Sequence, residues 1–297
     1  MNKLGVHAFV WTEGWTNNDA AKAIGLTAEA GYDLIEASAM DFGAFDVEFT
    51  RKVLEQNGLG VTLSFGLDST QDVSSGDPAR VRAGEQRLMD GVALARDIGA
   101  THVCGILYSA FQKYSVPPTP EGIKGSVDVV RRVGEKAKES GITLGMEVVN
   151  RYESNVLNTA AQAVEFVKRV SLPNVKVHLD CYHMNIEEAD VAAAIRDTGN
   201  NLGYFHTGDS HRGYLGSGSI DFSKIFRALV AIDYQGPITF ESFSSKVVGQ
   251  PLEGILGIWR NLWEDSRDLA THAKAYTEVQ LKSARESIAN PGRSRLN

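Results

Sequence analysis

The sequence predicts an α/β protein, a (β/α)₈ barrel that forms a single domain over residues 1–297. Short apolar, β-branched runs alternate with helical stretches. Eight such strand–helix units occupy about 250 residues, the usual size of this barrel. No Pro/Gly/Ser-rich linker, charge block or repeat of about 20–50 residues divides the chain. A doubly wound sheet remains an alternative, because alternation alone does not say whether the sheet closes.

The expected strands are the β-branched runs, and they lie near 4–10, 33–38, 60–66, 101–107, 142–148, 175–180, 202–206 and 237–241. The expected helices lie between them, near 17–30, 46–57, 78–98, 121–140, 158–170, 186–197 and 222–232, with a long helix after Pro251. Asp77 before Pro78 and Asp221 before an amphipathic run are helix start signals. The polar stretch from about 285 to 297 is expected to be a frayed tail.

Composition and charge exclude several classes of protein. The chain is 43% hydrophobic and 23% charged, as is usual for a globular domain. Its net charge of -7 disfavours nucleic-acid binding, which normally needs a basic surface. No apolar run approaches the roughly 18 residues of a membrane helix, and the N-terminal apolar stretch is too short for a signal peptide. Two cysteines, Cys104 and Cys181, provide no disulfide framework, so we expect a cytoplasmic protein without nucleic-acid or membrane partners.

Four consecutive predicted strands end in a residue that can bind a metal. Alternation along each strand places these residues on the face opposite the apolar side chains. They would therefore point into the barrel and meet at its C-terminal mouth, where enzymes of this fold build their active sites. The four residues are Glu147, Asp180, His206 and Glu241.

Three carboxylates and one imidazole predict a divalent cation, since the carboxylates would otherwise repel one another. This oxygen-rich set suits Mn²⁺, Mg²⁺ or Co²⁺, whereas Zn²⁺ more often takes histidine or thiolate ligands. Alone, each acidic residue could be a solvated loop carboxylate, and His206 a hydrogen-bonded structural histidine. Their agreement in register over adjacent strands favours a metal site. Cys181 alternates away from it and is expected to be a buried thiol.

Several stretches resemble the ketose 3-epimerases, a family that includes D-tagatose, D-psicose (D-allulose) and L-ribulose 3-epimerases within the xylose isomerase-like TIM barrels. They are GVHAFVWTEGW (5–15), GMEVVNRYE (145–153), HLDCYHMNIEE (178–188), FHTGDSHRGYLGSG (205–218) and FESFSS (240–245). The resemblance implies that the four strand-end residues bind Mn²⁺ or Co²⁺, with Mg²⁺ as a further candidate. It also implies that Glu147 and Glu241 are the acid/base pair that inverts C3 of a ketose through an enediolate.

The resemblance further implies substrate contacts near O1 to O3 of the sugar, from Glu153, His183 and Arg212. Their chemistry fits, because Arg212 and His183 can donate hydrogen bonds and Glu153 can accept them. The alternatives are a solvated loop charge for Arg212 and a surface ion pair with Arg151 for Glu153. Glu36, in an early strand, either contacts substrate or supports a residue that does.

The end of the first strand is expected to border the sugar. His7 stands where several family members have an aromatic residue, which affects the expected substrate preference. Trp15 is expected to form a wall at the distal end of the sugar, although large aromatics commonly fill a core instead. The glycine-rich loop 213–221 is a candidate lid, although such loops are commonly plain connections.

Rival functions keep the barrel and change the chemistry. An aldose–ketose isomerase or an inosose-type dehydratase would use the same metal site. An endonuclease IV-like nuclease would need several metals, more histidine ligands and a basic face. A non-catalytic barrel would be expected to lose one of the paired glutamates, and both are present. Family resemblance implies a homodimer or homotetramer, and apolar residues after Pro251 at helical spacing are candidates for the subunit contact.

Overall fold

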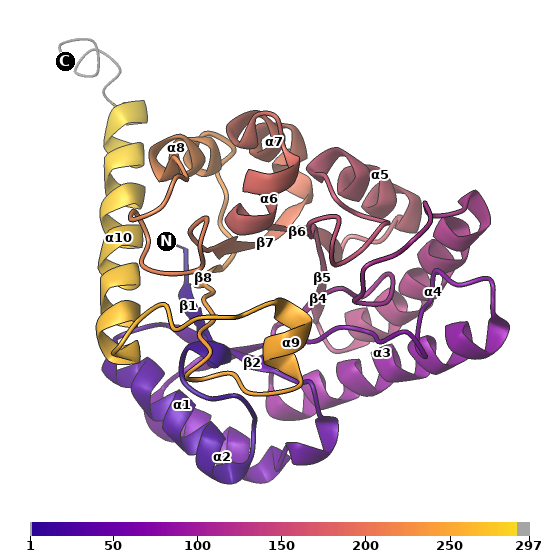
Figure 1. Ribbon diagram of the computed structural model, residues 1–297, viewed down its shortest axis with the longest axis horizontal. Coiled ribbons are helices and arrows are strands. Elements are labelled where there is room, and N and C mark those ends of the chain that lie inside the picture. Colours follow the sequence, from indigo (N-terminus) through magenta and orange to yellow (C-terminus); the bar gives the residue numbers. More distant parts are fainter. Residues whose placement is uncertain (1, 290–297) are drawn as a thin grey trace.

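The computed structural model of the protein describes residues 2–289, and in it the predicted barrel is closed (Figure 1). Its strands are β1 (Leu4–His7), β2 (Leu34–Ser38), β3 (Gly60–Ser64), β4 (His102–Gly105), β5 (Thr143–Glu147), β6 (Val175–Asp180), β7 (Leu202–Thr207) and β8 (Ile238–Phe240). Each strand pairs in parallel with the next one, and β8 pairs with β1. That last pairing excludes the open, doubly wound sheet.

Helices surround the barrel. They are α1 (Asn17–Glu29), α2 (Val47–Asn57), α3 (Pro78–Ile98), α4 (Pro120–Glu139), α5 (Ala160–Val170), α6 (Cys181–Glu187), α7 (Val191–Thr198), α8 (Phe222–Ala231), α9 (Leu252–Leu256) and α10 (Ser266–Ala289), with 3₁₀ turns η1 (Ala8–Val10), η2 (Phe42–Ala44) and η3 (Gly199–Asn201). Both predicted caps are confirmed: Asp77 accepts from the backbone N–H of Ala79, and Asp221 from that of Lys224. Among the described residues, no helix combines the length and apolarity that crossing a membrane requires.

Two predicted helices in the C-terminal half of the chain are wrong in their bounds. The helix expected at 186–197 is two helices, because the Asp180 side chain caps α6 at the strand end and Asp190 caps α7 separately. The long helix expected after Pro251 is the short α9, and the chain then runs without helix until α10. Gly257, in the left-handed conformation with φ 66°, ends α9.

The two ends of the described chain also differ from expectation. The first strand stops at His7, because the His7 imidazole accepts the backbone N–H of Phe9 and starts the turn η1. At the other end α10 continues to Ala289, so residues 285–289 are helical rather than frayed. Residues 290–297 of the predicted tail lie outside the described residues.

Strand register confirms the predicted alternation of faces. In β5, Leu144 and Met146 pack outward against α3 and α4, whereas Glu147 lines the cavity at the barrel mouth. Between β6 and β7 the register shifts at Val177/His178, so that His178 pairs with Tyr204 and Asp180 pairs with His206. The shift brings two inward-facing side chains level with each other. The strand pattern therefore places Asp180 and His206 side by side at the same height.

Candidate active site

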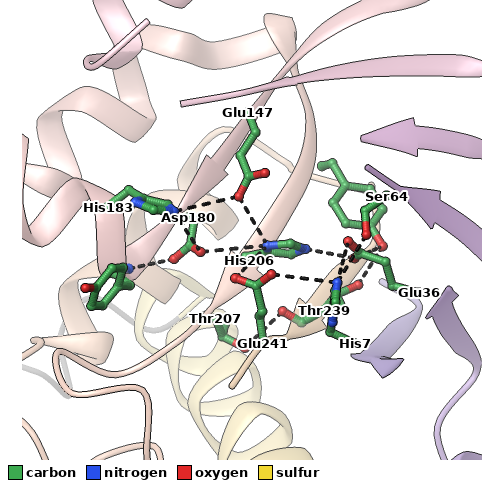
Figure 2. A network of polar contacts seen from close by, with 12 residues as sticks. His7, Glu36, Ser64, Glu147, Asp180, His183, His206, Thr207, Thr239 and Glu241 are labelled. Atoms are coloured by element: carbon green, nitrogen blue, oxygen red, sulfur yellow. Dashed lines mark hydrogen bonds and ion pairs between the residues drawn. The ribbon is translucent and has the colours of Figure 1, made fainter. Parts of the chain in front are cut away.

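The four predicted strand-end residues meet at the C-terminal mouth of the barrel. One ligand atom from each lies within 4.8 Å of the others, and the residues are Glu147, Asp180, His206 and Glu241. In Figure 2 the two glutamates point toward Asp180 and His206 from opposite sides. His206 Nδ1 lies 3.5 Å from Glu241 Oε2, 3.7 Å from Glu147 Oε1 and 3.8 Å from Asp180 Oδ2. The β5–β8 half of the barrel thus builds one compact cluster.

Glu36 determines how His206 is oriented. His206 Nε2 lies 2.8 Å from Glu36 Oε2, and the same oxygen accepts the hydroxyl of Tyr204 at 2.8 Å. Burial alone would raise the pKa of Glu36, but the charge of His206 and its hydrogen bond lower that pKa well below its usual value, so Glu36 is an ionised acceptor. Nε2 of His206 therefore carries a proton, and Nδ1 faces the carboxylates. Glu36 therefore supports His206, and it also lines the cavity beside it.

The donor set fits a divalent cation. His206 Nδ1 is buried and has no hydrogen-bond partner, although three carboxylate oxygens surround it. Burial alone would lower the pKa of His206, but the charges of Glu36 and Glu241 and the polar contacts with Asp180 and Glu241 raise it well above its ordinary value. A cation bound among them would replace the proton on Nδ1, because a metal takes imidazole in its neutral form. Three oxygens and one nitrogen are ligands that suit Mn²⁺, Co²⁺ or Mg²⁺.

The two glutamates have different electrostatic environments. Burial, followed by the nearby charge of Glu241, raises the pKa of Glu147 well above its ordinary value. Burial would also raise the pKa of Glu241, but the positive charges of Arg212 and His206 outweigh it and lower that pKa. Arg212 likewise holds the pKa of Asp180 well below its ordinary value against the effect of burial. One glutamate therefore favours its protonated form and the other its ionised form, as acid/base work requires.

Two further predicted residues, Arg212 and His183, lie around this cluster. Arg212 Nη1 is 2.9 Å from Asp180 Oδ2 and 2.8 Å from Glu241 Oε2, and its guanidinium lies 4.1 Å from the centre of the Tyr182 ring. Because α6 begins directly after Asp180, His183 lies one helical turn further on and 3.9 Å from Asp180 Oδ2. Arg212 is only 8% exposed, so it is not a solvated loop charge.

Glu153 and His7 complete the polar side of the cavity. Glu153 accepts from the Asn150 amide at 2.8 Å, whereas Arg151 pairs with Glu187, so the alternative of an Arg151–Glu153 surface pair is excluded. His7 Nδ1 accepts the N–H of Phe9, which leaves the proton on Nε2, 3.1 Å from Ser64 Oγ. His7 Nε2 also lies 3.8 Å from both Glu36 and Glu241. One cavity is lined by nearly all the predicted site residues described so far. The exceptions are Asp180 and His206, which are buried beside it.

Trp15 lies elsewhere, and this corrects its predicted place in the sugar wall. Its side chain is buried against α2, where its ring stacks on Phe45 and its indole N–H donates to Thr50. It does not line the cavity. The wall is formed instead by apolar residues, several of them around α9, namely Phe9, Phe65, Phe111, Phe243, Leu252, Leu256, Ile258, Trp259 and Leu262.

The cavity has a volume of about 480 Å³. The segment from α9 to residue 262 lies over the barrel mouth and forms its outer wall (Figure 1). The candidate lid 213–221 does not reach the cavity. Asp209 accepts the backbone N–H groups of Gly216 and Gly218, and Tyr214 donates to Asp268 on α10. That loop is therefore fastened to the side of the barrel.

Sequence reasoning missed three contributors. Ser64 and Tyr182 line the cavity, and Asn150 contacts both Glu153 and His183. Ser64 could have been found, because it ends a predicted strand on the inward face. Asn150 gives no such signal, since it follows a strand in a loop where alternation no longer applies. The apolar residues after Pro251 recur at helical spacing, but Ile258 and Leu262 lie beyond α9 and line the cavity wall.

Comparisons with known proteins agree with this architecture. The model of the xylose isomerase-like TIM barrel family matches residues 24–273. The chain is 47% identical over 279 residues to the ketose 3-epimerase of Arthrobacter globiformis, covering 94% of this chain and 96% of the relative. It is 44% identical to the L-ribulose 3-epimerase of Mesorhizobium japonicum, with 96% of each covered. The crystal structure of D-allulose 3-epimerase from Methylomonas sp. in complex with D-allulose is similar, with a TM-score of 0.92, 43% identity and coverage of 94% and 97%.

Proposed function

Because this chain belongs to the xylose isomerase-like TIM barrel family, and within it to the ketose 3-epimerases, we propose that it inverts C3 of free ketoses with a divalent metal ion. It is a sugar epimerase, in the isomerase class of enzymes. The observation that carries the proposal is the pair Glu147 and Glu241. They come from β5 and β8, with two strands between them, and approach Asp180 and His206 from opposite sides (Figure 2).

The pair provides the chemistry of inversion. The C3 hydrogen of a ketose is acidic because it is α to the C2 carbonyl. One carboxylate takes this proton, and the C–H electron pair moves into a C2–C3 double bond while negative charge develops on O2. The other glutamate, protonated, then returns a proton to C3 from the opposite face of the planar enediolate. General acid–base catalysis of this kind contributes about 10²–10⁴-fold.

Glu147, Asp180, His206 and Glu241 would hold the metal, Mn²⁺ first and Co²⁺ or Mg²⁺ as alternatives. Such a cation acts as a Lewis acid that stabilises the negative charge that develops on the sugar oxygens. The protein's own contribution is to fix the ligands, chiefly through the Glu36 contact to His206 and the Arg212 contact to Asp180. Arg212 and His183 can also donate to sugar oxygens from the side of Asp180.

The proposed substrates are D-tagatose, D-allulose and D-fructose, and L-ribulose and L-xylulose. The polar residues gather around the metal cluster, whereas the outer wall around α9 is apolar. A pocket of this kind holds C1 to C3 firmly and discriminates weakly among the more distant carbons, which supports a broad ketose specificity. His7 borders the reacting end, next to Glu241, and is the residue proposed to adjust the preference.

The test is deuterium incorporation by NMR. Purified protein with Mn²⁺ in D₂O is incubated separately with D-fructose, D-tagatose and L-ribulose, and the sugars are analysed after the protein and metal are removed. The proposal expects deuterium at C3 together with the C3 epimer, and several ketoses that react. Exchange at C1 or C2 with formation of an aldose would indicate an aldose–ketose isomerase. Absence of exchange with every ketose, while the metal binds, would favour a dehydratase or a non-catalytic barrel.

We also propose that the protein works as a homodimer or homotetramer in the cytoplasm. The exposed apolar residues Ile255 and Trp259, at 52% and 73% exposure, support a subunit contact near the cavity mouth. Light scattering after size exclusion measures the oligomeric state directly. A monomer at micromolar concentration would contradict this part of the proposal.

A further inference from the structure

Asn150 lies behind two residues that face the cavity, His183 and Glu153, and contacts both. Its amide nitrogen Nδ2 lies 2.9 Å from His183 Nδ1 and 2.8 Å from Glu153 Oε1. Its amide oxygen accepts the backbone N–H of Tyr152 at 2.9 Å. The backbone N–H of Tyr152 fixes the orientation of the amide, because a backbone N–H can only donate and the atom facing it must be the amide oxygen. Asn150 itself is buried, with 2% of its surface exposed.

These contacts determine where His183 carries its proton. The backbone N–H of Asn150 also points at His183 Nδ1, at 3.1 Å, so this nitrogen accepts from two donors of the same residue. A neutral imidazole has one acceptor and one N–H. The proton must therefore be on Nε2. The Arg212 Nη2 contact at 3.4 Å to Nε2 is then a close approach of two donors rather than a hydrogen bond.

The His183 Nε2–H group points into the cavity without a hydrogen-bond acceptor of its own. The three nearest carboxylates lie at 3.8 Å (Glu153), 3.9 Å (Asp180) and 4.0 Å (Glu147), all beyond hydrogen-bonding distance. Glu153 Oε2 likewise stays available, because Asn150 holds the other oxygen of that carboxylate. One donor and one acceptor are thus presented side by side, as recognition of a sugar hydroxyl pair requires.

We propose that Asn150 is a positioning residue that orients both His183 and Glu153 toward the sugar. It links two separate elements, since His183 belongs to α6 and Glu153 to the loop after β5. The backbone N–H of residue 150 sets the His183 proton on Nε2, and the side-chain amide reinforces it and holds Glu153 in place. The part of this inference that concerns substrate contacts rests on the proposed function. The position of the proton on His183 can be measured without any turnover of substrate.

The discriminating variant is Asn150→Asp, which keeps the shape of the side chain and removes both donated hydrogen bonds. A carboxylate there attracts a proton to His183 Nδ1 and repels Glu153. We expect KM to rise at least about tenfold, the range for a lost hydrogen bond to a charged group. We expect kcat to fall by less than about threefold, because the proton-transfer glutamates are untouched. Asn150→Ala keeps the backbone donor, so it should retain the His183 tautomer and show a smaller rise in KM.

Asn158→Asp is the matched control, with the same change of charge in the same loop. The Asn158 amide donates to the backbone carbonyls of Val149 and Ser154 and contacts neither His183 nor Glu153. A role limited to holding the loop would make both variants behave alike. We expect Asn158→Asp to keep KM within about twofold of wild type, because it touches no substrate contact.

The spectroscopic readout is ¹⁵N NMR of histidine-labelled protein loaded with Mg²⁺, with the signal of His183 assigned from His183→Gln. The chain has seven histidines, which keeps the spectrum tractable. Wild type and Asn150→Ala should show a protonated Nε2 and an unprotonated Nδ1, and Asn150→Asp should gain protonation at Nδ1. An unchanged His183 signal and unchanged KM in Asn150→Asp, or the same changes in Asn158→Asp, would overturn the proposal. If wild type converted no ketose, the proposed function would fail, and the NMR comparison would still decide what Asn150 does to His183.

Discussion

At the scale of single residues, Glu147 and Glu241 have unequal environments. Glu147 lies in surroundings that favour its neutral form, and Glu241 receives positive charge from Arg212 at 2.8 Å. Moving a proton from one face of a sugar carbon to the other needs a carboxyl group on each side. The two groups must differ in proton affinity, so that one takes a proton while the other gives one. Arg212, in the loop after β7, makes the largest contribution to lowering the pKa of Glu241, and the charge of His206 adds to it.

We predict that Glu147→Gln and Glu241→Gln each lower kcat by at least about 10³-fold, since each removes an acid/base group and a metal ligand. Each variant keeps one glutamate, so any residual exchange of the C3 hydrogen with solvent should occur in one C3 epimer only. Glu147→Gln and Glu241→Gln should differ in which epimer exchanges. NMR in D₂O measures both quantities. Glu85→Gln, in a surface pair with Arg132, is the control. Turnover above about a tenth of the wild-type rate in either variant would refute the two-glutamate assignment.

A second prediction concerns the half-buried His102, which begins β4 and whose ring centre lies 5.4 Å from that of Tyr204. Burial lowers its pKa from 6.5 to about 4. Between these values the unfolded chain binds more protons than the folded one, so the free energy of unfolding falls as the pH decreases from 6.5 toward 4. His102 should account for about 2 kcal/mol of this loss between pH 7 and pH 5. Urea titrations of His102→Asn at several pH values should show a correspondingly flatter dependence of stability on pH.

The cluster of four strand-end residues was predictable from sequence, and the residues that support it were only partly so. Strand alternation alone placed Glu147, Asp180, His206 and Glu241 on inward faces at neighbouring strand ends. Alternation is a local rule, so it fails once a strand has ended. The contacts of Asn150 depend on how a loop folds back onto α6, and no spacing in the sequence encodes that path. Trp15 was assigned by its aromatic character, and its burial against Phe45 and Thr50 depends on packing that a single sequence does not reveal.

At the scale of elements, the loop after β7 supplies Arg212 and is held by one buried carboxylate. Asp209 accepts three backbone N–H groups, from Ser210, Gly216 and Gly218. Arg212 has φ 60°, in the left-handed region, and its carbonyl accepts the hydroxyl of Ser242. The position of Arg212 between Asp180 and Glu241 therefore depends on the whole loop.

We predict that Asp209→Asn lowers the free energy of unfolding by about 2 kcal/mol, because an amide nitrogen replaces one acceptor and leaves buried N–H groups unpaired. The same variant should raise KM, since Arg212 loses its fixed support. Urea unfolding and steady-state kinetics measure the two effects. Asp221→Asn is the control, because asparagine caps a helix as well as aspartate does. Stability within about 0.5 kcal/mol of wild type for Asp209→Asn would contradict the role assigned to this loop.

The segment between β8 and α10 shows why element boundaries were the least predictable feature. Its apolar residues recur at helical spacing, yet only Leu252–Leu256 form a helix. Residues such as Ile258 and Leu262 are apolar because they line a cavity wall. The spacing of apolar residues in a sequence indicates which side chains are buried. It does not indicate whether they pack within a helix face or around a pocket.

At the scale of the whole molecule, metal binding and stability should be linked. The four proposed ligands exist as a set only in the folded barrel, so a cation that binds them stabilises the native state. At a concentration a thousandfold above its Kd, one such ion contributes about 4 kcal/mol. We predict that EDTA lowers Tm by several degrees and abolishes turnover, and that Mn²⁺ restores both. In Asp180→Asn, chelator and Mn²⁺ should change Tm much less. An unchanged Tm in wild type on chelation would contradict a metal held by this cluster.

The distribution of the ligands along the chain has a consequence for biosynthesis. They run from residue 147 to residue 241, one on each of four successive strands, and their supports His7 and Glu36 come from β1 and β2. No fragment that ends before β8 can assemble the site. During synthesis on the ribosome, the four proposed ligands can therefore come together as a set only when nearly the entire barrel has emerged.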